Sequence, residues 1–159
     1  MIDVVAIERV VERELTKIKI ELIDKYDSLG MRASGKWAEN LEIEIISDGN
    51  TIKARILGLD YTRQLVFGRA PGSFPPIVEI ENWIDNKGIV SDIPTEQLAF
   101  LIARKIKNFG TKWYQQGGTE LVADVVTDAR VEVLLAAVSE VVIFDTSQFL
   151  RSQLQRLAA

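Results

Sequence analysis

The 159-residue sequence contains no cysteine and no histidine. Without cysteine the chain has no disulfide and no thiolate nucleophile, and without both residues it has no zinc site of the Cys/His type. The absence of histidine also excludes Ser-His-Asp and Cys-His catalysis and every acid–base step by imidazole. The composition still allows three kinds of site: a metal site made only of carboxylates, a lysine nucleophile or a carboxylate pair.

Long apolar runs are also absent from the sequence. One of the longest, residues 131–138, is interrupted by Glu132 and falls far short of the roughly 20 apolar residues that a membrane span needs. The N-terminus lacks a basic segment followed by an apolar one. We therefore expect no signal peptide and no membrane partner, and the lack of cysteine is compatible with a reducing cytoplasm.

The overall composition is that of one globular domain. Hydrophobic residues make up 47% of the chain and charged residues 26%, which is enough apolar material for a sizeable core. The net charge of −4 argues against a general nucleic-acid binder but leaves room for a local basic patch. We expect an α+β fold with an antiparallel sheet of three or four strands packed by helices.

Periodicity in the first 67 residues predicts a long helix and then strands. Apolar residues at steps of three and four indicate a helix over about 2–29, ended by Gly30, which packs on its own domain or partly on a neighbouring subunit. Alternation over 41–45 and 51–57, around an Asp48-Gly49-Asn50 turn, predicts an antiparallel hairpin. A third strand over about 61–67 would extend it into a meander.

The rest of the chain is predicted to be mainly helical. Pro76 suits the first turn of a helix running to Lys87, and Thr95 suits the N-cap of a helix that ends at Phe109. A short helix over 119–126 and a longer one over 127–144 follow, and residues 145–147 would cap a C-terminal stretch that is a helix or a tail. The valines of this region favour a strand, but helical spacing favours the helix, which we choose.

A loop over residues 68–76 is the segment richest in glycine and proline. It has neither the GxGxxG spacing nor the GK[ST] ending of a phosphate-binding loop, so we interpret it as a shaped recognition loop. The acidic residues of the following helix predict a solvated face rather than a catalytic pair, and the Asp48 turn lacks the pattern of a calcium loop. We expect no cofactor, no bound metal and no catalytic residue. The candidate interface residues are Gly68, Arg69, Pro71, Gly72, Phe74, Pro75, Pro76, Trp83, Trp113 and Tyr114.

The stretch 104–114 combines basic and aromatic side chains without an acid. Such interleaving is found in nucleic-acid-binding surfaces, but basic residues are also favoured at helix C-termini by the helix dipole. Trp113-Tyr114 fits an exposed anchor for a protein contact. The basic residues are Arg104, Lys105, Lys107 and Lys112, and Phe109 lies among them.

The chain carries Ser34-Gly35 before the predicted hairpin, Phe67-Gly68 at the end of the predicted third strand, Pro75-Pro76 in the loop and Trp83 in the next helix. The order of these features resembles the tail-completion and head–tail joining proteins of tailed bacteriophages. Those proteins often show a long N-terminal helix, a Ser-Gly segment, a strand ending in an aromatic–glycine pair, a proline-rich loop and a helix with tryptophan. The resemblance covers roughly residues 1–112, and the chain departs from the pattern in residues 119–159, a C-terminal extension. The matching features are Ser34-Gly35, Phe67-Gly68, Pro75-Pro76, Trp83, Lys87-Gly88, the segment 99–106 and Gly110-Thr111.

The resemblance implies a non-enzymatic protein of the virion neck, made in the host cytoplasm and built into a ring of identical subunits. Its partners would be other copies of itself, the portal or connector and the tail, and a surface facing the lumen would touch passing genomic DNA. No small-molecule substrate is implied. The alternatives are an accessory or regulatory protein that contacts nucleic acid through residues 104–114, and a hydrolase whose metal is held by carboxylates alone.

Overall fold

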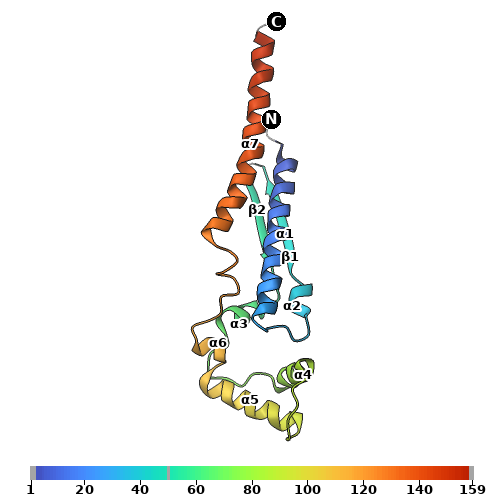
Figure 1. Ribbon diagram of the computed structural model, residues 1–159, viewed down its shortest axis with the longest axis vertical. Coiled ribbons are helices and arrows are strands. Elements are labelled where there is room, and N and C mark those ends of the chain that lie inside the picture. Colours follow the sequence, from blue (N-terminus) through green and yellow to red (C-terminus); the bar gives the residue numbers. More distant parts are fainter. Residues whose placement is uncertain (1–2, 50, 158–159) are drawn as a thin grey trace. The chain divides into compact units, whose positions relative to one another are not determined.

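The computed structural model describes residues 3–49 and 51–157 and divides the chain into two compact units. The first unit comprises Met1–Leu22, Glu42–Leu57 and Ala123–Ala159, and the second comprises Ile23–Leu41 and Gly58–Val122. The elements are labelled in Figure 1. In chain order they are α1 (Val4–Ser28), α2 (Lys36–Glu39), β1 (Glu42–Asp48), β2 (Thr51–Leu57), α3 (Thr62–Phe67), α4 (Ile77–Lys87), α5 (Thr95–Phe109), α6 (Lys112–Gln115) and α7 (Asp128–Leu157).

The first unit joins most of α1 to the β1–β2 hairpin and to α7. The helices run antiparallel, because Arg130 near the start of α7 donates to Glu21 at 2.7 Å, whereas Asp145 accepts from the backbone N–H of Asp3 at 2.6 Å. The long N-terminal helix is confirmed. Its buried side chains in this unit recur at steps of three and four, as amphipathic packing requires, and are Val11, Glu14, Leu15, Ile18 and Leu22.

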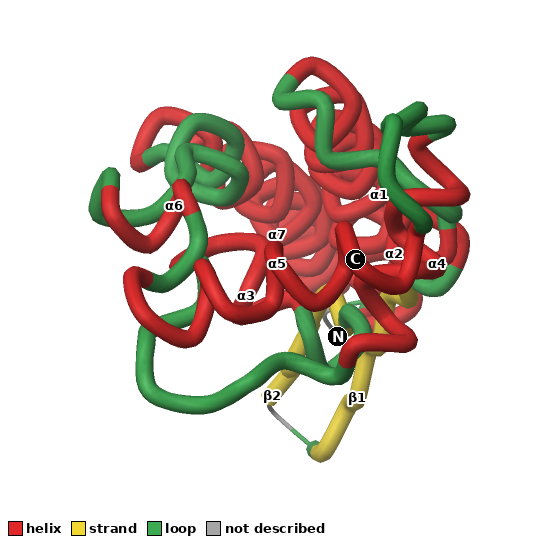
Figure 2. Tube along the Cα trace, turned by 90° about the horizontal axis from the view of Figure 1, so that it is seen from below, coloured by secondary structure: helices red, strands yellow, loops and turns green. Residues whose placement is uncertain are grey.

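The hairpin is confirmed in its position and pairing, but the sheet is smaller than predicted. Ile43 pairs with Ile56 and Ile45 with Ala54, and the two strands form the only sheet in the described part of the chain (Figure 2). The third strand and the meander were wrong, because residues 62–67 form α3. The Thr62 side chain and backbone both bond to Leu59 O, which starts a helical turn where we predicted that the hairpin would continue into a third strand.

The second unit has two apolar clusters. Trp37 is almost fully buried; its ring centroid lies 4.7 Å from that of Tyr26 and its indole N–H donates to the Thr62 hydroxyl at 2.9 Å. The other cluster joins Ile80 and Ile84 of α4 to the alanines of α5. Small residues on α5 let the two helices approach closely, so the pair behaves as one packed hairpin.

Several helix boundaries differ from the sequence predictions. The helix over 95–109 is confirmed, but its N-cap is Pro94 and Thr95 is already helical. Residues 119–126 form turns instead of a helix. The long C-terminal helix is confirmed, but it continues unbroken through 145–147, where we predicted the cap of a separate C-terminal stretch. The Asp145 carboxylate accepts from the Asp3 backbone N–H instead.

Helix α7 leaves many apolar side chains in solvent. Ile143, Phe144, Leu154 and Leu157 are all exposed. By length and composition alone this helix is apolar enough to cross a membrane, although it contains four acidic residues, Asp128, Glu132, Glu140 and Asp145. Our expectation of no membrane partner therefore stays a prediction.

Candidate functional site

The glycine- and proline-rich loop of the second unit is fixed against the turn between α5 and α6. The Arg69 backbone N–H donates to the Thr111 hydroxyl at 2.9 Å, and the Thr111 N–H donates back to Arg69 O at 3.0 Å. The Gly72 N–H donates to Lys107 O at 2.8 Å. We call this contact between residues 68–72 and 107–114 the junction.

Two glycines make the junction sterically feasible. Gly68 (φ 73°, ψ −179°) and Gly110 (φ 75°, ψ 179°) both occupy a backbone region that is essentially restricted to glycine. A Cβ on Gly68 would collide with the Tyr114 backbone nitrogen and lie 2.6 Å from the Thr111 hydroxyl oxygen. A Cβ on Gly110 would lie 2.8 Å from Arg69 O. Each glycine thus makes room for the segment that contains the other.

The side chains of the loop are held in part by the loop itself and in part by α5. Arg69 is half-buried and donates to the Ser73 hydroxyl and to Phe74 O, at 3.2 and 3.3 Å. The exposed ring of Phe74 stacks on Phe100, with 6.0 Å between centroids, and the Lys107 ammonium lies 4.6 Å from the Phe74 centroid. Phe74 is therefore presented in a defined position, whereas the Arg69 guanidinium is largely engaged inside the loop.

The structure brings most, but not all, of the candidate interface residues together. Gly68, Arg69, Pro71, Gly72 and Tyr114 meet at the junction. The neighbouring Phe74 and Tyr114 are exposed, Trp113 is half-buried, Pro75 is buried and Pro76 is the N-cap of α4. Trp83 lies on α4 and is partly exposed.

Two residues essential to this arrangement were not predicted as site residues, although Gly110-Thr111 was noted as a turn. Thr111 supplies both bonds to Arg69, and its place directly after Gly110 was a usable signal, because threonine after a helix-ending glycine is well placed to cap the next turn. Phe100 was interpreted only as part of a helix, and the sequence carries no signal that its ring stacks on Phe74.

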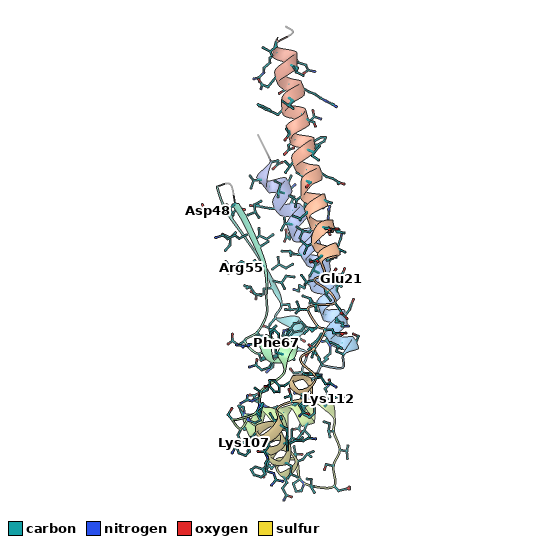
Figure 3. All side chains as sticks on the ribbon, turned by 90° about the vertical axis from the view of Figure 1, so that its left-hand side faces the viewer. Glu21, Asp48, Arg55, Phe67, Lys107 and Lys112 are labelled. Carbon is teal, nitrogen blue, oxygen red and sulfur yellow. The ribbon has the colours of Figure 1, made fainter. Side chains whose placement is uncertain are left out.

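A basic surface adjoins the junction. Arg104, Lys105, Lys107 and Lys112 are exposed, and none forms an ion pair with any residue in 3–49 or 51–157. Figure 3 shows the long side chains of Lys107 and Lys112 on this part of the unit. A shallow depression of about 360 Å³ lies on α5 and is lined by Glu96, Gln97, Phe100 and Leu101. Such groups suit binding by charge and apolar contact.

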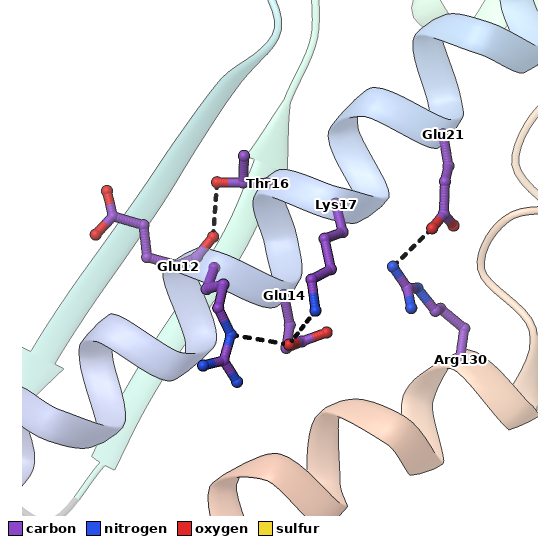
Figure 4. Close-up of polar contacts among 7 residues, drawn as sticks. Glu12, Glu14, Thr16, Lys17, Glu21 and Arg130 are labelled. Carbon is purple, nitrogen blue, oxygen red and sulfur yellow. Dashed lines mark hydrogen bonds and ion pairs between the residues drawn. The ribbon is translucent and has the colours of Figure 1, made fainter.

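The described residues contain no group of three or more Asp and Glu side chains close enough to hold a metal ion. Glu14 in the first unit has the one buried carboxylate among residues 3–49 and 51–157, and Lys17 and Arg13 donate to its Oε1 at 2.8 and 3.1 Å (Figure 4). The Lys17 hydrogen bond lowers the pKa of Glu14 despite its burial. Oε2 has no hydrogen-bond partner among the described residues, so burial of this oxygen costs free energy that only the two bonds to Oε1 offset.

Comparison of the chain with protein-family models, with curated proteins and with solved structures finds no match in any of the three.

Proposed function

We propose that this chain is a structural protein of the bacteriophage neck, where a ring of identical copies joins the head to the tail. The proposal starts from the resemblance in order and spacing over residues 1–112. It assigns the chain no catalytic role and no cofactor. Its partners are further copies, the portal or connector and the tail, after assembly in the host cytoplasm.

The observation that carries the proposal is the amount of apolar surface that each unit leaves uncovered. Val78, Val90 and Phe109 are exposed in the second unit, by 62%, 96% and 62%. In the first unit Leu154 and Leu157 are exposed by 65% and 84%. Scattered single apolar residues are normal on a monomer, but so many large ones favour a chain that is covered by partners when it works.

The loop over 68–76 is one surface that the proposal assigns to assembly. Its backbone is fixed by the junction, so a partner would not have to order it on binding, which lowers the entropic cost of association. We expect Phe74→Ala to weaken head–tail joining strongly. Arg69→Ala should do the same by loosening the loop that holds Phe74. Normal assembly and joining by both variants would remove this loop from the interface.

Imaging of particles tests the proposal as a whole. Particles carrying this chain with a small electron-dense label should show the label where head and tail meet, and particles made without the chain should appear as separate heads and tails. Label distributed along the tail tube or over the capsid shell would refute the neck assignment.

A second candidate function follows from the basic surface on α5 and α6. Four exposed cations without ion pairs among the described residues, next to the exposed rings of Phe109 and Tyr114, also suit the backbone and bases of a nucleic acid. An accessory protein of this kind would bind DNA with an affinity that falls steeply as salt rises, because phosphate neutralisation releases counterions. Titration of labelled DNA at 50 and 200 mM salt tests it.

A further inference from the structure

The acidic residues of α4, like the basic residues of α5, lack ion-pair partners among the described residues. Glu79, Glu81 and Asp85 form no ion pair within residues 3–49 and 51–157. The one basic residue of the helix, Lys87, donates to Gly30 O and so turns to the backbone instead. The exposed Val78 lies on the same stripe of α4 as Asp85, seven residues further along. We call the surface formed by Val78, Glu79 and Asp85, with Glu81 at its flank, the acidic face.

The acidic face and the basic surface lie on opposite sides of one helix pair. Ile80 and Ile84 of α4 pack against Ala99 and Ala103 of α5, so each helix turns its inner side to the other. At 100° per residue, Glu79 and Asp85 fall on the side of α4 that faces away from α5, whereas the half-buried Glu81 lies at the flank of the helix. By the same count Arg104 and Lys105 fall on the outer side of α5.

We propose that in the ring the acidic face of α4 in one copy packs against the basic surface of α5 and α6 in the next copy. This inference rests on the proposed function and names the subunit contact within it. A ring requires heterologous contacts, in which two different surfaces of the same chain complement each other. Charges of opposite sign on opposite sides of one unit provide that complementarity and fix the direction of the contact.

A second copy accounts for both surfaces, whereas DNA accounts for only one. Duplex DNA would neutralise the cations of α5 and α6 but would leave Glu79 and Asp85, on the opposite side of the helix pair, without a partner. A second copy pairs three acids with a similar number of cations. It also offers Val78 to the depression beside Phe100 and Leu101, which gives the contact an apolar centre within a charged rim.

Charge reversal tests the pairing. The acid-reversed variant carries Glu79→Lys, Glu81→Lys and Asp85→Lys, and the base-reversed variant carries Arg104→Glu, Lys105→Glu and Lys112→Glu. Lys107 is left unchanged because it lies over the Phe74 ring. We expect each variant to self-associate roughly tenfold or more weakly than the natural chain, since three attractions become repulsions. A chain with all six changes should associate again, because its two faces are complementary once more.

A matched control changes the same number of charges elsewhere. Glu12→Lys, Glu132→Lys and Glu140→Lys lie on exposed positions of the first unit, and this variant should associate like the natural chain. Light scattering after size-exclusion chromatography at 50 mM salt measures the association, and circular dichroism checks that every variant is folded. If both reversed variants associate normally, or the six-change chain does not recover, the proposed pairing is wrong.

Cross-linking keeps the test decisive where the isolated chain does not associate. The natural chain has no cysteine, so the Glu79→Cys/Lys105→Cys variant carries the only two thiols. In assembled particles a bismaleimide should link copies into a ladder of multimers, since each link is head to tail. The absence of such a ladder would overturn the pairing. So would a base-reversed variant that no longer binds DNA but still self-associates like the natural chain. Label away from the neck would refute the proposed function while leaving the ladder as evidence for the contact.

Discussion

Substitution of Gly68 by alanine should disrupt the junction far more than its small size suggests. The residue has φ 73° and ψ −179°, and its missing side chain leaves the space in which the Tyr114 backbone and the Thr111 hydroxyl lie. An added methyl group would have to displace backbone atoms, which cannot rotate away as a flexible side chain can. Gly68→Ala should therefore separate the loop from the α5–α6 turn.

The expected cost combines strain and lost hydrogen bonds. A non-glycine residue in this backbone region costs about 1–3 kcal/mol. The two bonds between Arg69 and Thr111 contribute about 1 kcal/mol each and are lost when the segments part. The free energy of unfolding should fall by about 3–5 kcal/mol, a large share of the roughly 5–15 kcal/mol typical of a small protein.

Urea unfolding followed by tryptophan fluorescence measures this cost. All three tryptophans, Trp37, Trp83 and Trp113, belong to the second unit, so the signal reports on the unit that contains the junction. Gly88→Ala is the matched control: Gly88 has φ 64° and ψ 34°, nothing lies within 4 Å of its Cβ position, and its cost should be about 1 kcal/mol. A Gly68→Ala cost no larger than that of Gly88→Ala would refute the steric reasoning.

Three further predictions concern other parts of the chain. Because its pKa is lowered, Glu14 adds stability above the ordinary pKa of glutamate, about 4.3, and this stability is lost as the pH falls through the folded-state pKa. In urea titrations, Glu14→Gln should therefore reduce the difference between the free energies of unfolding at pH 6 and pH 3. An unchanged difference would count against this. Thr62→Val leaves the buried Trp37 indole N–H without its acceptor and should lower the free energy of unfolding by about 1–3 kcal/mol, whereas Thr51→Val, at an exposed position of β2, should change it little. If α7 functions by binding protein partners, the purified chain should not float with neutral lipid vesicles in a density gradient. Flotation that the Ile143→Lys variant loses would instead support a membrane role for α7.

The sequence predicted the elements whose periodicity extends over many residues. The helices now bounded as α1, α4 and α5 each repeat their apolar positions over several turns, and β1 and β2 alternate around a clear turn signal. The failure at 62–67 has a physical cause. Six residues are too few to separate a helical from an alternating pattern, and the deciding interactions come from Thr62, which bonds to Leu59 and to the distant Trp37.

The sequence predicted which segments contribute to the candidate site but not that these segments contact each other. Glycine and proline at 68–76 marked an unusual loop, and Trp113 and Tyr114 marked a second segment. Nothing local to either segment indicated that they meet, because the meeting depends on hydrogen bonds between residues 42 positions apart. The isolation of the acids on α4 and of the cations on α5 and α6 is likewise a property of the folded unit, since a charge run in a sequence is often paired on folding.

The place of the junction in the chain links it to the proposed subunit contact. The loop over 68–76 leads directly into α4, and Gly110 directly ends α5, so the junction ties the start of one helix to the end of the next. The helix pair is then closed at its open end as well as by the connection between the helices. The junction and the packing of α4 on α5 together hold the acidic face and the basic surface at one angle. Under the proposed pairing, that angle would set how far each copy is rotated relative to the next. Loss of the junction should therefore alter which assemblies form before it abolishes the charge pairing itself.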